Sequence, residues 1–403
     1  MYRRLTRSRA FRGPLPMMSL EHLKVLDLTT HLSGPYCAMI LADHGADVVK
    51  VERPDGGDDM RKTPPRNGGE SAPFMVWNRN KRSVALNLKA PAELARLLQL
   101  ADVADVLIEN FKPGTAARLG IGYEAMAARN PSLIYCSISG FGQTGPYAPR
   151  GGFDLIASGM SGLMSINGPS AGPPYRIPVP LTDLCGGMNG AIGVLIALAA
   201  RAHTGRGQHV DTSLFESGLA LGVYEAASVF TSGEVPERLG QGHRGSAPYQ
   251  IFTTADSFVT VGCANDKFWT KACDILGCAQ FVDDPRYKSK AERVALTDTL
   301  AAELAPYFAK QPTAHWCAEF EKAGIPVGPV LNHVEALADP QAKAREMVVE
   351  VEHPTAGKSK TLGVPVKLSD TPGSVRRAAP LLGAHNDEVF DDWLAAKPAA
   401  AAQ

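Results

Sequence analysis

The sequence predicts an α/β protein in which a parallel, doubly wound sheet builds a large domain and a smaller α+β domain follows it. Short apolar runs alternate with helical patterns over the first half of the chain, and after about residue 225 the pattern changes to a hairpin followed by helices. The chain is 403 residues long. That length favours two or three domains.

The first domain is expected to begin at Leu20 and to alternate strands with helices. Apolar runs predict strands at 23–28, 47–52, 83–88, 104–109, 132–138 and 208–214. Apolar residues three and four apart predict helices at 35–44, 91–101 and 115–128, and an apolar Gly- and Ala-rich helix at 184–201. Strands that alternate with helices of this length are typical of a parallel sheet.

The second half of the chain has a different pattern. Residues 249–254 and 258–262 flank Ala255-Asp256-Ser257 and predict a β-hairpin, and helical patterns follow near 266–278, 293–309 and 313–324. We therefore expect a large domain over 20–225, a small α+β domain over 226–326 and a return to the large domain over 327–395. Residues 1–19 and 396–403 are expected to be a disordered leader and tail.

Composition excludes several classes of function. Lys and Arg number 41, as do Asp and Glu, so the chain carries no net charge and is not expected to bind nucleic acid. No apolar run approaches the roughly 18 residues of a membrane span. The seven cysteines are scattered without Cys-x-x-Cys spacing, which favours reduced thiols over disulfides or a metal site.

These observations predict a soluble, cytoplasmic enzyme without a metal or a prosthetic group. The first twenty residues hold five arginines and no acidic residue. Such a leader is similar to a mitochondrial transit peptide, so the mitochondrial matrix is the alternative location.

One glycine motif matches part of the dinucleotide-binding pattern but lacks the helix that such a site needs. Gly140 to Gly145 matches G-x-G-x-x-G and follows a predicted strand, but Pro146 and Pro149 come next instead of a helix. A helix N-terminus is needed there to bind the pyrophosphate. We therefore do not expect NAD(P) binding.

Asp183 is the candidate catalytic residue. It stands at the start of the long apolar helix, where an N-cap role is the ordinary alternative. Gly186 and Gly187 follow it and would leave its carboxylate accessible to a ligand. A carboxylate can attack an activated acyl group such as a thioester, and helix N-terminal N–H groups can stabilise the resulting oxyanion.

Basic and aromatic residues follow two predicted strands. Arg53 comes after one strand, and Asn110, Phe111 and Lys112 come after another. Ligands of open parallel sheets bind along this edge. Cations beside a Phe suit a ligand with phosphates and a flat base, although solvated surface charges are the alternative. The glycine-rich segment 240–246 is expected to be either a mobile cover over the active site or an ordinary linker.

Several motifs together resemble the class III CoA-transferases, the family of formyl-CoA and carnitine CoA-transferases that also contains α-methylacyl-CoA racemases. They lie in family order across residues 20–395 and include the segments 25–28, 33–35, 45–54, 78–83, 109–114, 182–183, 204–211 and 380–383. The resemblance implies a Rossmann-like large domain, an interlocked homodimer, and acyl-CoA and a small carboxylic acid as substrates. It also implies an aspartyl anhydride and an aspartyl-CoA thioester as intermediates.

The resemblance also assigns roles to individual residues. Asp183 is the implied nucleophile. The implied contacts with CoA and its thioester are Leu32, Ser33, Arg53, Leu86, Lys89, Asn110, Phe111, Lys112 and Arg118. The implied substrate-binding residues are Phe153, His243, Arg244 and Gly245.

Departures from the family pattern refine the expected reaction. Phe153 stands where the racemases carry a histidine base, which favours CoA transfer and leaves racemisation as the alternative. Leu32 replaces a Gln of the formyl-CoA transferases, and residues 243–245 replace a glycine run, which argues against a one-carbon or oxalyl substrate. The segment 139–146 is more similar to succinyl-CoA–dicarboxylate CoA-transferases. His243 or Arg244 is therefore expected to pair with a distal substrate carboxylate.

Overall fold

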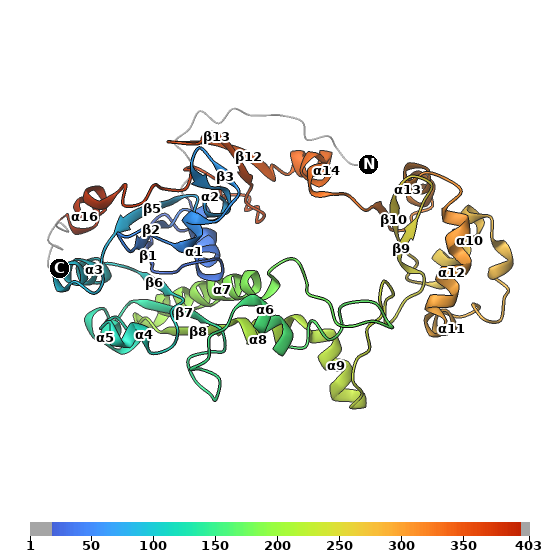
Figure 1. The fold of residues 1–403 in the computed structure, drawn as a ribbon, viewed down its shortest axis with the longest axis horizontal. Coiled ribbons are helices and arrows are strands. Elements are labelled where there is room, and N and C mark those ends of the chain that lie inside the picture. Colours follow the sequence, from blue (N-terminus) through green and yellow to red (C-terminus); the bar gives the residue numbers. More distant parts are fainter. Residues whose placement is uncertain (1–17, 396–403) are drawn as a thin grey trace. The chain divides into compact units, whose positions relative to one another are not determined.

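A computed structural model describes residues 18–395 (Figure 1). The expected tail 396–403 and most of the expected leader therefore lie outside the described residues. The chain divides into two compact units. The first contains the described parts of 1–161, 179–221 and 341–403, and the second contains 162–178 and 222–340.

A six-stranded parallel sheet forms the centre of the first unit. Its strands lie in the order β5-β2-β1-β6-β7-β8. Their bounds are β1 Lys24–Asp27, β2 Asp47–Glu52, β5 Lys81–Ala85, β6 Val106–Glu109, β7 Ile134–Ser139 and β8 His209–Ser213. Numbered along the chain, these six strands have the Rossmann order 3-2-1-4-5-6, with the reversal between β1 and β6. The predicted fold class is confirmed.

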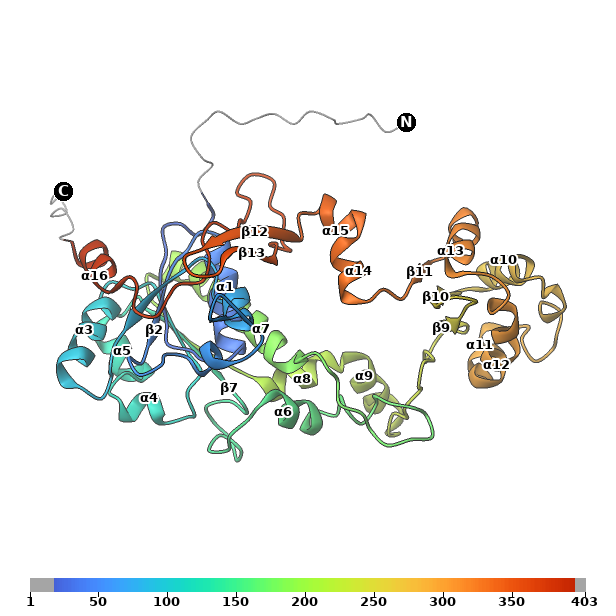
Figure 2. The same cartoon turned by 45° about the horizontal axis from the view of Figure 1, so that its top comes forward.

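Both faces of this sheet are covered by helices. One face packs against α3 (Pro91–Ala101), α5 (Tyr123–Arg129) and α16 (Asn386–Leu394). The other packs against α1 (Ser33–Asp43) and α7 (Leu181–Thr204) (Figure 2). Strands buried on both faces need continuous apolar runs, which is why the short Val- and Leu-rich segments of the sequence located them. Leu26, for example, is fully buried and lies opposite Val49 and Leu107.

Most predicted elements differ from the structure by one to three residues at an end, and two predicted helices are each divided. The strand expected at 83–88 begins at Lys81, and the helix expected at 184–201 is α7, which begins at Leu181. The helix expected at 115–128 is two helices, α4 (Thr115–Arg118) and α5, with Gly120 between them in the left-handed region. The helix expected at 293–309 is also two, α11 (Lys290–Ala295) and α12 (Thr297–Phe308), because Ser289 and Glu292 form a capping box that starts an earlier helix.

Short elements were not predicted. They include the 3-10 helix η1 (Asp59–Lys62), β3 (Arg66–Asn67), β4 (Glu70–Ser71), α2 (Ala72–Trp77), α6 (Asp154–Met160), α8 (Leu214–Leu221), α9 (Val223–Ser232), the 3-10 helix η2 (Ala279–Phe281), α14 (His333–Ala338), α15 (Pro340–Ala344), β12 (Val348–His353), β13 (Gly357–Leu362) and α16. Most of them are too short to establish a period in the sequence.

The second unit contains the predicted hairpin, β9 (Tyr249–Thr253) and β10 (Phe258–Gly262). Its helices include α10 (Asp266–Leu276) and α13 (Thr313–Lys322), which pack with α12 around Trp269, Phe308 and Phe320. β11 (Val327–Pro329) pairs with β10, so these residues belong to this sheet and not to a return to the large domain at 327. The second unit also contains the separate segment 162–178. Its main part runs over 222–340, compared with the expected 226–326.

Within residues 18–395, helix α7 is covered on one side only. By length and composition it is apolar enough to cross a membrane, although its sequence was not expected to do so. Its glycine and alanine face is buried against α1 and β7, whereas Met188, Ile192 and Ile196 are exposed on the other face.

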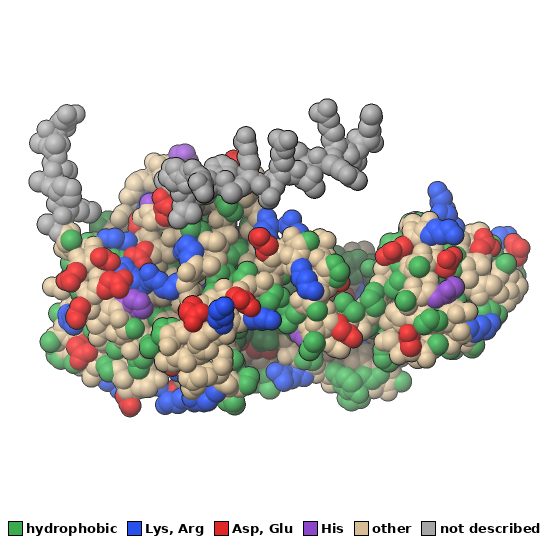
Figure 3. All heavy atoms as spheres, turned by 90° about the horizontal axis from the view of Figure 1, so that it is seen from above, with side chains coloured by type: hydrophobic (Ala, Val, Ile, Leu, Met, Phe, Trp, Pro, Cys, Tyr) green, Lys and Arg blue, Asp and Glu red, His purple; other side chains and the backbone are tan. Residues whose placement is uncertain are grey.

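Acidic and basic side chains are interspersed over the face drawn in Figure 3, as the balanced charge suggests.

Candidate active site

A cavity of about 260 Å³ opens at the carboxyl ends of β1, β2 and β5, beside the point where the strand order reverses. Ligands of parallel α/β sheets bind at such a switch point. Its lining residues are Leu28, Thr29, Thr30, Val51, Glu52, Arg53, Gly57, Asp58, Asp59, Leu86, Asn87, Leu88, Lys89, Phe111 and Leu119.

The cavity brings four of the predicted CoA contacts together. These are Arg53, Leu86, Lys89 and Phe111. They come from three segments that lie far apart in the sequence, and each follows a strand of the sheet. Lys112 and Arg118 are exposed and do not line the cavity, so their contact with a ligand stays a prediction.

The charges that line the cavity leave it suited to an anion. Glu52 is bound at 2.7 Å by both Nε and Nη2 of Arg61, and Asp58 pairs with Lys50 at 3.0 Å. Arg53 pairs with Asp59 in the solvent, where such pairs contribute little and exchange readily. Lys89 has no side-chain partner among residues 18–395.

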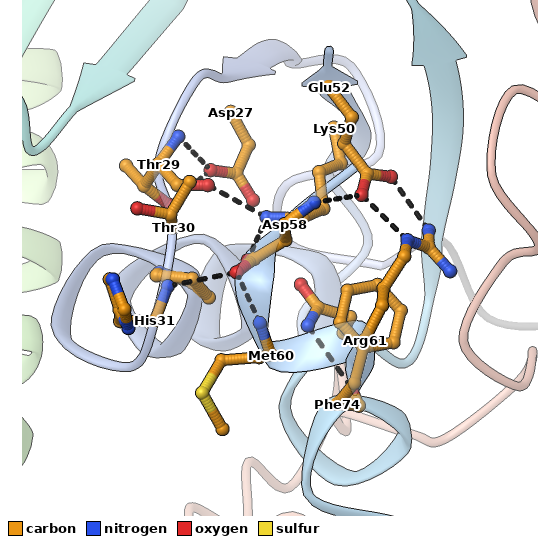
Figure 4. Close-up of polar contacts among 12 residues, drawn as sticks. Asp27, Thr29, Thr30, His31, Lys50, Glu52, Asp58, Met60, Arg61 and Phe74 are labelled. Carbon is orange, nitrogen blue, oxygen red and sulfur yellow. Dashed lines mark hydrogen bonds and ion pairs between the residues drawn. The ribbon is translucent and has the colours of Figure 1, made fainter. Parts of the chain in front are cut away.

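A buried ionic network lies beneath the cavity (Figure 4). Lys81 Nζ donates to Asp27 Oδ2 at 2.8 Å, and Lys50 Nζ lies beside both Asp27 and Asp58. Burial would raise the pKa of Asp27, but Lys81 and Lys50 outweigh it and lower that pKa to about 2. Burial lowers the pKa of Lys81 to about 8 despite the Asp27 charge. Asp27 and Lys81 are therefore both charged at neutral pH.

Asp183 lies in the first turn of α7, not at its N-cap. The N-cap position is Pro180, and the capping hydrogen bond comes from elsewhere: Asp154 Oδ1 accepts from the Thr182 backbone N–H at 2.9 Å and from its hydroxyl at 2.8 Å. The Asp183 carboxylate is half-buried and has no hydrogen-bond partner within the described part of the chain. Burial, and then the charge of Asp154, raise its pKa to about 6.

The start of α7 lies against the start of α1. Gly187 is one turn beyond Asp183, and a Cβ atom built there would lie 2.5 Å from the Ser33 backbone oxygen. Only glycine permits this approach. Leu32 and Ser33, the residues expected to border the thioester, therefore lie on the segment that contacts α7 next to Asp183.

Two aromatic residues mark the same region. Phe153 is 68% exposed and immediately precedes Asp154, and its ring lies edge-on to that of His31 with 6.1 Å between centroids. Sequence reasoning did not single out His31. The sequence indicated only that His31 follows a predicted strand. Its left-handed backbone conformation, with φ of 65°, cannot be read from the sequence.

His243, Arg244 and Gly245 belong to the second unit. Arg244 Nε donates to Glu225 at 3.2 Å and its Nη2 donates to the Glu237 backbone oxygen at 3.0 Å. His243 and Arg244 line a cavity of about 550 Å³ within that unit. The role of all three toward a substrate stays a prediction.

Comparison with protein families identifies the chain. Residues 20–386 match the model described as CoA-transferase family III. The chain belongs to CoA-transferase family III. The expected resemblance is confirmed, and the substrates of such enzymes are CoA thioesters.

Curated relatives are similar over nearly the whole chain. The human succinyl-CoA:glutarate CoA-transferase is 39% identical, over 93% of this chain and 86% of the relative. The succinyl-CoA:mesaconate CoA-transferase of Haloarcula marismortui is 39% identical, over 93% and 96%. The acetyl-CoA:oxalate CoA-transferase of Acetobacter aceti is 41% identical, over 88% and 90%. The expectation against an oxalyl substrate stays a prediction.

A solved structure shares the fold. The CAIB/BAIF family protein from Brucella suis superposes with a TM-score of 0.85 at 35% identity, over 93% of this chain and 99% of that one. The Rossmann-like sheet and the second unit are therefore features of a family III CoA-transferase.

Proposed function

We propose that the protein transfers CoA from succinyl-CoA to a dicarboxylic acid, with Asp183 as the nucleophile. The carrying observation is the Asp183 carboxylate itself, half-buried, without a hydrogen-bond partner in the described chain and next to the segment that bears Leu32 and Ser33. Two relatives that match most of the chain are named as succinyl-CoA transferases, which supports succinyl-CoA as the donor.

The first half of the reaction moves CoA onto the enzyme. A carboxylate oxygen of Asp183 attacks the thioester carbonyl, the C–S bond breaks, and a mixed anhydride and CoA thiolate form. The thiolate then attacks the Asp183 carbonyl carbon and breaks the anhydride C–O bond. The donor acid leaves as its carboxylate, and an aspartyl-CoA thioester remains.

The second half reverses these steps on the acceptor. The acceptor carboxylate attacks the aspartyl thioester and displaces CoA thiolate, which gives a second anhydride. The thiolate attacks the acceptor carbonyl, so that acceptor-CoA and the free Asp183 carboxylate form. No net proton is gained or lost, which is why Phe153 can stand where a racemase needs a base.

A trapping experiment tests the nucleophile. The enzyme is incubated with succinyl-CoA and hydroxylamine, and peptide mass spectrometry is expected to find a hydroxamate on Asp183. In the Asp183→Ala variant the rate of CoA transfer should fall at least about a thousandfold, because alanine has no carboxylate to attack the thioester. Cys185→Ala is the matched control, because Cys185 carries the neighbouring nucleophilic group and burial raises the pKa of its thiol.

Two results would contradict the assignment. One is a hydroxamate on another residue, and the other is an Asp183→Ala enzyme that keeps its transfer rate. A panel of acyl-CoA donors against mono- and dicarboxylic acids, read by mass spectrometry, tests the substrate class separately. We expect turnover with succinyl-CoA and dicarboxylates such as glutarate. Turnover confined to monocarboxylates would exclude the proposed acceptor.

We also propose that two copies form an interlocked homodimer. The support is the uncovered apolar face of α7, whose Ile192 and Ile196 are 53% and 65% exposed. Exposed apolar faces of this kind commonly mark a protein–protein interface.

A further inference from the structure

We infer that the buried Lys50–Asp58 ion pair is a positioning device that holds the backbone of residues 29–31 and so sets the CoA cavity in place relative to Asp183. The inference rests on the proposed function, because it concerns the same site. Neither residue stands among the predicted CoA contacts. Figure 4 shows both side chains directed toward this segment.

Side chains bind five successive backbone groups of this segment. At Thr29, the N–H donates to Asp27 Oδ1 at 3.0 Å and the carbonyl oxygen accepts from Lys50 Nζ at 2.8 Å. At Thr30, the N–H donates to Asn110 Oδ1 at 2.9 Å and the carbonyl oxygen accepts from Asn110 Nδ2 at 2.8 Å. The His31 N–H donates to Asp58 Oδ1 at 3.2 Å.

The ion pair links the two ends of this segment. Lys50 holds the carbonyl of Thr29, Asp58 holds the N–H of His31, and the two side chains bind each other at 3.0 Å with no solvent exposure. His31 adopts the left-handed region, which a residue other than glycine occupies only when its surroundings impose it.

The charges of the cluster balance. Three cations, Lys50, Lys81 and Arg61, stand against three carboxylates, Asp27, Asp58 and Glu52. A buried ion pair is weak as a source of stability, since an apolar pair of similar volume is often as stable. A role in fixing a segment explains the pair better than a role in stability does.

The held segment joins the two halves of the site. Thr29 and Thr30 line the CoA cavity, and Asp58 lines it as well. The chain continues into Leu32 and Ser33, and Ser33 touches α7 at Gly187, one turn from Asp183. A displacement of this segment would therefore move the cavity wall relative to the nucleophile. Misplacement by about 1 Å can slow catalysis about a hundredfold.

The test replaces both charges together. In Lys50→Met/Asp58→Asn no unpaired buried charge remains, and the new amide can still accept from His31, but the Thr29 carbonyl loses its donor. We expect kcat for CoA transfer to fall about 10- to 100-fold while KM for acyl-CoA changes by less than about threefold. Hydrogen–deuterium exchange in the peptide that spans 28–34 should be at least about tenfold faster.

A second buried pair supplies the matched control. Arg79 binds Asp43 at 2.7 Å, with side-chain exposures of 2% and 3%, and Asp43 lies at the other end of α1. Arg79→Met/Asp43→Asn should lower Tm at least as much as the first double variant. Its kcat and its exchange in 28–34 should stay within about twofold of the wild type.

The following outcomes would overturn the inference or separate it from the proposed function. The inference is overturned if Lys50→Met/Asp58→Asn keeps both kcat and the exchange rate of 28–34, or if the two double variants lose kcat equally. Should the first double variant fail to fold, Lys50→Met alone gives the same readouts, because it removes the donor of the Thr29 carbonyl while Asp58 keeps the N–H groups of His31 and Met60. If the wild type transfers no CoA, the proposed function fails, whereas the exchange rate of 28–34 in the two double variants still decides whether the ion pair holds this segment.

Discussion

At the scale of the residue, the raised pKa of Asp183 has two separate consequences. Burial and the charge of Asp154 disfavour the ionised carboxylate, although the ionised form is the proposed nucleophile. If Asp183 is the nucleophile, the fold keeps its reactive form at a cost in stability, a pattern common at active sites.

The first consequence is a pH dependence of the rate. Because the pKa of Asp183 is raised to about 6, kcat/KM should rise about tenfold per pH unit below that value and level off above it. The measurement is transfer from succinyl-CoA between about pH 5 and pH 8, with the CoA product quantified directly. A profile that is flat over this range would contradict the raised pKa.

The second consequence is a pH dependence of stability. The folded-state pKa of Asp183 lies above the unfolded value of 3.8, so the folded chain binds this proton more tightly than the unfolded chain does. Proton binding therefore stabilises the fold at low pH, and this stabilisation is lost as pH rises through about 6. Asp183→Asn should therefore be more stable than the wild type at pH 7 by about 1 kcal/mol, after discounting for a half-buried side chain. Below about pH 4 the difference should vanish, and urea unfolding at both pH values measures it.

Lys89 and Arg53 lead to a third prediction. Both line the cavity, and Lys89 has no ionic partner in the described structure. Lys89→Ala and Arg53→Ala should each weaken CoA binding about five- to tenfold, with a smaller loss at high salt because the contacts are ionic and exposed. Titration calorimetry measures both. Lys358→Ala, an exposed lysine of β13, is the control and should bind as the wild type does.

At the scale of the element, the contact of α1 with α7 decides where Asp183 lies. Gly187→Ala would place a Cβ atom 2.5 Å from the Ser33 oxygen and 3.1 Å from the Tyr36 ring. Because the first obstacle is backbone, α1 must move, and we expect a loss of about 1–3 kcal/mol of stability together with a lower kcat.

A second glycine of α7 provides the control for this substitution. At Gly193 the nearest obstacle is the end of the Val210 side chain, which can shift more easily than backbone. Gly193→Ala also gains helix propensity. It should therefore cost less stability and leave kcat unchanged. If both variants behave as the wild type does, the close approach of α1 to α7 does not position Asp183.

The sequence predicted the elements that have a strong local signal. All six strands of the large sheet, α3, the hairpin and the long apolar helix were located because apolar runs and helical periods are local properties. The splits at Gly120 and Leu296 were missed, since a continuous apolar pattern does not reveal a break in the helix axis. The pairing of β11 with β10 was missed because it joins segments about 70 residues apart.

At the scale of the whole molecule, the uncovered face of α7 predicts the oligomeric state. If a second copy covers it, the protein should elute with a light-scattering mass twice the 42.8 kDa of one chain. Ile192→Lys/Ile196→Lys should dissociate the dimer or prevent its assembly, because two charges would be buried in an apolar contact. Gln99→Lys, on the exposed side of α3, is the control. A wild type that is monomeric at all concentrations would refute the dimer.

The sequence by itself determined the α/β class, the order of the main elements, the resemblance to a CoA-transferase family and the choice of Asp183. These depend on patterns and motifs that are contiguous in the chain. The tertiary structure alone revealed that Asp154 caps α7 in place of Asp183 and that Asn110 binds the backbone of Thr30. It also revealed that Lys50 and Asp58 contact the segment between the cavity and Asp183. Partners such as Asn110 and Thr30 are 80 residues apart, and only the packing of the parallel strands brings them to one edge of the sheet.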